Sequence, residues 1–116
     1  DLLYVKDTVK AFIDIANAEN LIGEDVNIAT QSEISVENLA RILIKHINPN
    51  AKIISDEVRL RPEKSEVFRL FGSNQKLTSL TTWKPKFDLE NGLKHTIDWF
   101  SISENLSSYK SDIYNL

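Results

Sequence analysis

The sequence predicts a small mixed α/β domain in which a few short strands pack with about four helices. Two observations carry this prediction. Short runs of β-branched and aromatic residues alternate with stretches whose apolar residues repeat at helical spacing. The strands are too few and too short for a doubly wound sheet. A chain of 116 residues is long enough for one domain with a modest core.

The first half of the chain predicts a strand, a helix and two further strands. The first strand covers residues 2–5, and the helix begins at Asp7 and ends near Gly23. The helix is expected to bury one apolar face, which holds Val9, Phe12, Ile13 and Ala16. The other strands are expected over residues 25–29 and 52–54, with a second helix between them.

Good N-caps mark this second helix and the last well-defined one. Ser35 begins a helix that ends at Asn48, with an apolar stripe of Val36, Leu39, Ala40, Leu43 and Ile47. Asp88 begins the other, whose stripe comprises Leu89, Leu93, Thr96, Ile97 and Phe100. Both stripes predict helices that pack on a core.

The segments between and after these helices are less regular. Residues 56–65 are expected to form an ordered charged loop, and residues 67–71 a short strand. Ser73 or Asn74 can cap a brief helix. Residues 101–116 are expected to form a docked tail or a frayed helix, so the predicted domain covers residues 1–100.

Composition excludes several functional classes. The net charge of −3 argues against a general nucleic-acid binder. No apolar run approaches the ~20 residues that span a bilayer. The chain has no cysteine and two distant histidines, His46 and His95, so a metal site has little support. It shows no signal peptide, and a first residue other than methionine, Asp1, suggests a fragment or a processed chain.

Three motifs occur in a characteristic order. The first is Asp-Leu-Leu-Tyr-Val-Lys-Asp over residues 1–7, and the second is Val-Asn-Ile-Ala over residues 26–29. The third begins with Trp-Lys-Pro at residue 83 and continues into the helix with Gly92 and Trp99. In this order they resemble the C-terminal substrate-binding domain of extended short-chain dehydrogenase/reductases, the family that includes nucleotide-sugar epimerases and 4,6-dehydratases. The resemblance covers roughly residues 1–100.

The stretch Arg-Pro-Glu-Lys-Ser-Glu-Val over residues 61–67 narrows the resemblance. It is similar to the corresponding stretch of GDP-mannose 4,6-dehydratases and, more closely, of N-acetylglucosamine-nucleotide 4,6-dehydratases from bacterial surface-polysaccharide pathways. Epimerases and dTDP-glucose dehydratases more often have Arg-Pro-Gly there, with an Asp or His soon after. A 4-epimerase of the same family remains the alternative.

The resemblance implies a larger cytoplasmic enzyme with NAD as its cofactor. Such an enzyme oxidises the sugar at C4, eliminates water across C5 and C6, and returns the hydride to C6. NAD and the catalytic Tyr-x-x-x-Lys pair would belong to a Rossmann half, which this sequence lacks, as it lacks a Gly-rich phosphate loop. The chain would therefore bind a nucleotide diphosphate-sugar, bind no cofactor itself, and be inactive without its own Rossmann domain. The intact enzyme is expected to be a homodimer.

Arg61 is the main candidate for a substrate ligand. The planar guanidinium of arginine makes two parallel hydrogen bonds to phosphate oxygens, and Pro62 stiffens the backbone behind it. Arg59 lies two residues away and can face the same anion in an extended segment. The resemblance singles out Arg61 as the diphosphate ligand. The alternative is a solvated basic turn that pairs with nearby carboxylates.

Three further residues are candidates for polar contacts with the ligand. Glu66 could orient Arg61 or accept a sugar hydroxyl, or it could be a surface carboxylate. Ser65 and Asn27 are weaker candidates, and Asn27 could equally close a turn. The aromatic residues are expected in the core rather than as stacking platforms for a base; these are Tyr4, Phe68, Phe71, Trp83 and Trp99.

Two readings from other classes stay open. The chain could be a standalone, non-catalytic binding module that reused this half-domain. It could also be a plain α/β scaffold whose charged loop is only solvated.

Overall fold

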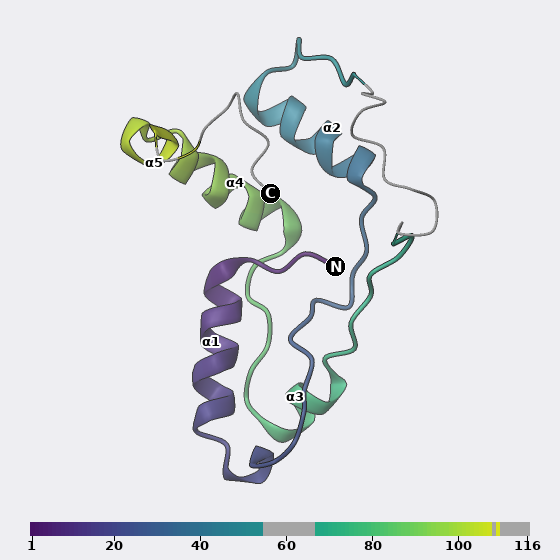
Figure 1. Cartoon of the computed structure of the whole chain (residues 1–116), viewed down its shortest axis with the longest axis vertical. Helices are drawn as coiled ribbons and strands as arrows, with labels where there is room; N and C mark the ends of the chain where they lie inside the picture. The colour runs from purple at the N-terminus through teal and green to yellow at the C-terminus, as the bar shows by residue number, and fades with distance from the viewer. Residues whose placement is uncertain (55–66, 108, 110–116) are drawn as a thin grey trace.

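Figure 1 shows a computed structural model of the chain, which describes residues 1–54, 67–107 and 109. The described residues form helices that are joined by long irregular segments. These are α1 (Val5–Ala16), η1 (Glu19–Leu21), α2 (Val36–Ile47), α3 (Gln75–Leu80), α4 (Leu89–Phe100) and α5 (Ser103–Ser107), where η1 is a 3-10 turn. The described part therefore has five α-helices instead of about four.

The two expected N-caps are confirmed. Ser35 Oγ accepts a hydrogen bond of 3.2 Å from the backbone N–H of Asn38 in the first turn of α2. Asp88 Oδ1 accepts one of 2.8 Å from the backbone N–H of Asn91 in α4. Each cap satisfies one of the donors that a helix leaves without a partner at its first turn. The local sequence therefore fixes where these two helices begin.

The predicted strands are wrong for the part of the chain that the structure describes, because it contains no strand. Val5, expected to end a strand over 2–5, begins α1 instead. Residues 25–29 do alternate in burial, since Val26 and Ile28 are half-buried and Asn27 is exposed. Alternation reports only which side chains are buried, whereas a strand also needs a hydrogen-bonded neighbour. The stretches 52–54 and 67–71 likewise lie in irregular segments.

A small core holds the lower half of the molecule in Figure 1 together. Its buried residues are Ala11 of α1, Leu21 of η1, Leu77 of α3, and Trp83. The Trp83 indole N–H also donates a hydrogen bond of 3.0 Å to the backbone carbonyl of Asp7. The core position expected for Trp83 is therefore confirmed, and its one polar group is satisfied.

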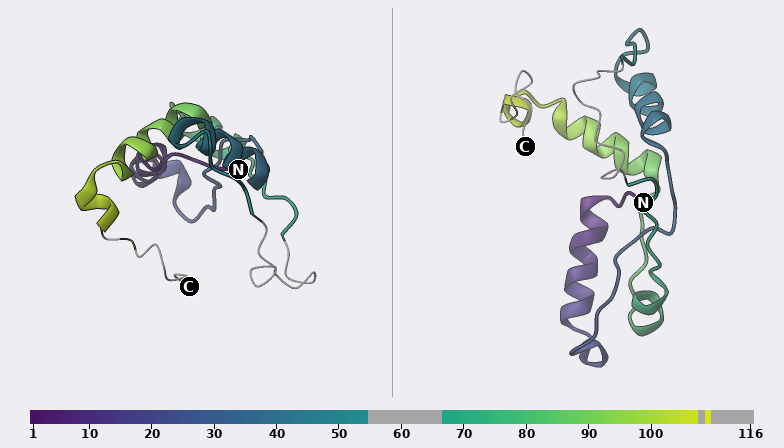
Figure 2. Two further views of the ribbon diagram at one scale, coloured as in Figure 1. Left: turned by 90° about the horizontal axis from the view of Figure 1, so that it is seen from above. Right: turned by 45° about the vertical axis from the view of Figure 1, so that its right-hand side comes forward.

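The other half contains α2, α4 and α5. Helix α4 packs against both α2 and α5, as the views in Figures 1 and 2 show. Gly92 of α4 is buried where the helix crosses the N-terminal segment. A Cβ atom at Gly92 would lie 3.2 Å from Tyr4 Cβ, so a small residue allows this close crossing.

Several side chains that were expected in the core are exposed. They include Trp99, Phe68 and Phe71. The first helix also differs, since it starts at Val5 and ends at Ala16, and its buried residues are Asp7 and Ala11. The face that was expected to be buried is exposed because the opposite face of α1 packs on the core around Trp83.

Candidate functional site

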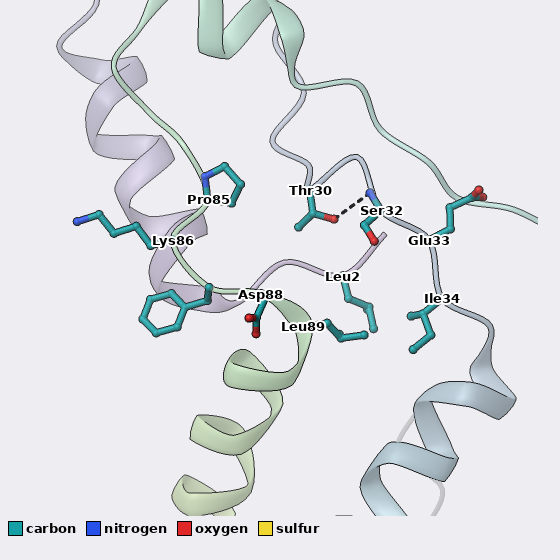
Figure 3. Close-up of a pocket in the computed structure, with 10 residues that line it drawn as sticks. Leu2, Thr30, Ser32, Glu33, Ile34, Pro85, Lys86, Asp88 and Leu89 are labelled. Carbon is teal, nitrogen blue, oxygen red and sulfur yellow. Dashed lines mark hydrogen bonds between the residues drawn. The ribbon is translucent and has the colours of Figure 1, made fainter.

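A cavity of about 410 Å³ lies where the N-terminal segment meets two chain segments from distant parts of the sequence (Figure 3). One wall is the segment that leads into α2, and the other is the segment that leads into α4. The lining mixes polar and apolar side chains, namely Leu2, Thr30, Ser32, Glu33, Ile34, Pro85, Lys86, Phe87, Asp88 and Leu89.

The carboxylate of Asp1 joins the segments around this cavity. One oxygen, Oδ1, accepts hydrogen bonds from the backbone N–H and the hydroxyl of Thr30, at 2.9 and 2.7 Å. The other oxygen, Oδ2, accepts from the backbone N–H of Gln31 at 3.1 Å and of Gly72 at 3.4 Å. Charge-assisted hydrogen bonds of this kind are stronger than neutral ones. Asp1 therefore fixes the turn that carries the polar wall of the cavity.

A buried amide supports the same turn from behind. Asn74 is buried, and its Nδ2 donates a hydrogen bond of 2.8 Å to the carbonyl of Ala29. Its Oδ1 accepts one from Gln31 Nε2 at 2.5 Å. Gln31 has a φ of 58°, in the left-handed region that few residues other than glycine adopt. These contacts hold a strained turn in place beside the cavity.

Glu33 forms a two-point ion pair with Arg69, which arrives from the other side of the undescribed segment 55–66. Arg69 Nε and Nη2 lie 2.9 and 2.5 Å from the two carboxylate oxygens of Glu33. The hydrogen bond from Arg69 lowers the pKa of Glu33, and the same contact raises the pKa of Arg69. The pair aligns the two segments in a fork-to-fork geometry. It also neutralises the carboxylate at the mouth of the cavity.

Asp7 fixes the opposite wall. Its side chain is buried, and Oδ2 accepts hydrogen bonds of 3.0 Å from the backbone N–H groups of both Lys86 and Phe87. The sequence predicts Asp7 as the start of a helix, and Asp7 also belongs to the first motif. Its buried contacts show a second role, which is to position the segment that lines the cavity.

The polar groups in the lining are the hydroxyls of Thr30 and Ser32, the carboxylates of Glu33 and Asp88, and the ammonium of Lys86. Thr30 Oγ1 accepts a hydrogen bond of 3.3 Å from the backbone N–H of Ser32, as the dashed line in Figure 3 shows. The Ser32 side chain and the Lys86 side chain are exposed. Such groups can bind hydroxyls or an anion in a half-apolar pocket.

Most of the predicted ligand residues lie outside the described residues. These are Arg59, Arg61, Ser65 and Glu66, so their roles stay predictions. Asn27 is described and exposed, but it does not line the cavity. Arg69 lies just after residues 55–66 and pairs with Glu33 of the segment that leads into α2, and neither was predicted from the sequence as a site residue. No local pattern links the two residues, because they lie 36 positions apart.

The glycines do not fit a dinucleotide-binding loop. Gly23 has a φ of +81° and follows η1 in a turn. Gly72 packs against Ala29, and Gly92 packs against Tyr4. Among the described residues, no three histidine or acidic side chains form a group that could hold a metal ion. Within the same residues, no helix has the length and apolar character needed to cross a membrane.

Curated relatives of the chain are enzymes that act on nucleotide-sugars. A Methanocaldococcus jannaschii protein, provisionally described as a UDP-glucose 4-epimerase, is 36% identical over 85% of this chain and 30% of its own length. The dTDP-D-glucose 4,6-dehydratase of Mus musculus is 34% identical over 96% of this chain and 31% of its own length. A Bacillus cytotoxicus UDP-N-acetyl-alpha-D-glucosaminuronate decarboxylase is 31% identical over 88% of this chain and 32% of its own length.

The chain thus spans about a third of the length of these relatives. No family model matches it. No solved structure matches it either. Relatives with 31–36% identity over most of the chain confirm the resemblance that the motifs indicated. The chain therefore belongs to the family of nucleotide-sugar dehydratases and epimerases, within the extended short-chain dehydrogenase/reductases.

Proposed function

We propose that the chain is the nucleotide-sugar-binding part of an NAD-dependent nucleotide-sugar 4,6-dehydratase. The observation that carries the proposal is the similarity of 96% of the chain to about a third of the dTDP-D-glucose 4,6-dehydratase of Mus musculus. In this proposal, NAD and the catalytic residues belong to the part of the relatives that the chain does not cover. The chain alone binds the nucleotide diphosphate-sugar without converting it.

The substrate would enter beside the segments that Asp1, Glu33 and Arg69 hold together. Arg69, which follows the 61–67 motif, pairs with Glu33 in the lining of the cavity, so the chain that follows the motif lies beside this cavity. Because Arg69 is already paired, Arg61 is the arginine proposed for the diphosphate. The mixed lining of the cavity suits a sugar ring, which presents both hydroxyls and apolar C–H faces.

Two measurements on the polypeptide as its cell makes it test this proposal. Its intact mass should exceed that of the 116 residues by about twice the mass of this chain, because the chain matches only about a third of the length of its relatives. Incubation with NAD and a nucleotide-diphospho-hexose should give a product that has lost one water, read by mass spectrometry. A product of unchanged mass but altered stereochemistry would favour the 4-epimerase instead. A native mass equal to this chain would leave the non-catalytic binding module.

Arg61→Ala tests the proposed diphosphate ligand. Losing a charge-assisted, two-point contact should weaken nucleotide-sugar binding in that polypeptide by about ten- to a hundredfold, or about 1.5–3 kcal/mol. Calorimetric titration of a nucleotide diphosphate-sugar measures this. Arg41→Ala is the matched control, because Arg41 is exposed on α2 and pairs only with Glu37 among the described residues. Equal affinity of Arg61→Ala and the parent protein would remove Arg61 from the site.

A further inference from the structure

Helix α1 is apolar on two opposite faces. Its inner face, with Ala11 and Ile15, packs on the core around Trp83. Its outer face comprises Val5, Val9, Phe12, Ile13 and Ala16, which recur at the spacing of one helical stripe. An apolar stripe of a helix normally faces a core or a partner. The outer face of α1 is nevertheless exposed.

More than half of each large apolar side chain on this outer face is exposed to solvent. Val5 is 62% exposed, Val9 52%, Phe12 64% and Ile13 51%. Together these side chains leave roughly 400 Å² of apolar surface bare, a size at which patches on monomers mark interaction sites. The face continues at its N-terminal end into a groove of about 870 Å³, whose lining includes Val5, Trp99 and Ile102.

We propose that the outer face of α1 is the docking surface for the remainder of a longer polypeptide, the part that holds the cofactor. This inference rests on the proposed function, because the proposed function supplies the occupant of the outer face. The relatives are about three times as long as the chain, so they contain enough additional sequence to supply the partner. The occupant would present a complementary apolar surface to Val9, Phe12 and Ile13.

The bare area favours this occupant over a second copy of the chain. A stable complex of separate molecules buries about 800 Å² on each partner, about twice the area of the outer face. Domains that share one chain associate through smaller interfaces, of about 600–1,500 Å² in total, since the linker keeps them close together. A face of roughly 400 Å² on one partner gives about twice that area in total, which lies in the range for domains that share one chain.

Hydrogen exchange tests the inference without a substitution. The backbone amides of α1 should exchange at least about tenfold more slowly in the longer polypeptide than in the 116-residue chain. Equal exchange in the two proteins would overturn the inference. It would leave the proposed function standing if the longer polypeptide still binds and converts the nucleotide-sugar.

A pair of variants tests the face itself. Phe12→Glu should leave the unfolding midpoint of the 116-residue chain unchanged, and should abolish the slower exchange of α1 in the longer polypeptide. Lys10→Gln, the control, changes an exposed side chain on the same helix outside both the outer face and the groove, and should preserve that slower exchange. A 116-residue chain that forms a dimer by analytical ultracentrifugation, and that Phe12→Glu returns to a monomer, would identify a second copy as the occupant and overturn the inference.

Discussion

The two hydrogen bonds that Asp7 accepts give the most direct test of how this fold is held together. Oδ2 of Asp7 accepts from the backbone N–H groups of Lys86 and Phe87 at 3.0 Å each, and the side chain is buried. Asp7→Ala removes the one oxygen that accepts both bonds and leaves two part-buried donors without this partner. Each such donor costs about 1–3 kcal/mol, so the free energy of unfolding should fall by about 2–6 kcal/mol.

Asp7→Asn separates the geometry of this contact from its charge. Both bonds go to a single oxygen, so the amide oxygen of asparagine can accept both in its place. Only the charge assistance is lost, and the expected cost is about 1–2 kcal/mol.

Urea unfolding followed by circular dichroism measures both variants on the 116-residue chain. The reasoning would be refuted if Asp7→Ala and Asp7→Asn lowered the free energy of unfolding equally. It would also be refuted if Asp7→Ala cost less than about 1 kcal/mol.

Other contacts give shorter tests. Gly72→Ala should destabilise the chain by about 1–3 kcal/mol in the same urea assay, because the new Cβ would lie 2.6 Å from Ala29 Cβ. Ser35→Ala should cost about 1 kcal/mol through loss of the α2 cap, and a change under about 0.3 kcal/mol would contradict that role. Glu33, whose pKa is lowered by Arg69, should stabilise the fold above its unfolded pKa and lose this contribution as the pH falls through its lowered folded pKa. Glu33→Gln should make the urea midpoint less dependent on pH across that acid range. An unchanged dependence on pH would argue against the ion pair in solution.

The local signals in the sequence were read correctly where they depend on neighbouring residues alone. Ser35 and Asp88 each satisfy a donor within their own first turn, so the residue type and its position were enough. Trp83 was predicted in the core, rather than stacked on a base, because of its position near Pro85, and Trp83 is buried. The family was likewise predicted from the order of short motifs.

The sequence did not predict a residue's role where that role depends on a distant partner. Periodicity showed that Val9, Phe12 and Ile13 share a face of α1, but not which of the two apolar faces the core would take. The apolar residues from Val26 to Ala29 indicated a strand, but not whether a neighbouring strand would pair with it. The anchoring role of Asp1 could not be foreseen either, since its hydrogen-bond partners lie 29 to 71 residues away.

The contact between Trp83 and Asp7 has a consequence for the order in which the molecule assembles during synthesis. The two residues are 76 positions apart, so α1 leaves the ribosome long before the indole that completes its inner face. At 5–20 residues per second, the delay is roughly 4–15 s, far longer than the time in which a helix forms. For that interval the inner face of α1 lacks the indole that completes it. A chaperone that binds exposed apolar helices would therefore have time to bind this inner face, and slower translation between the two residues would lengthen the encounter.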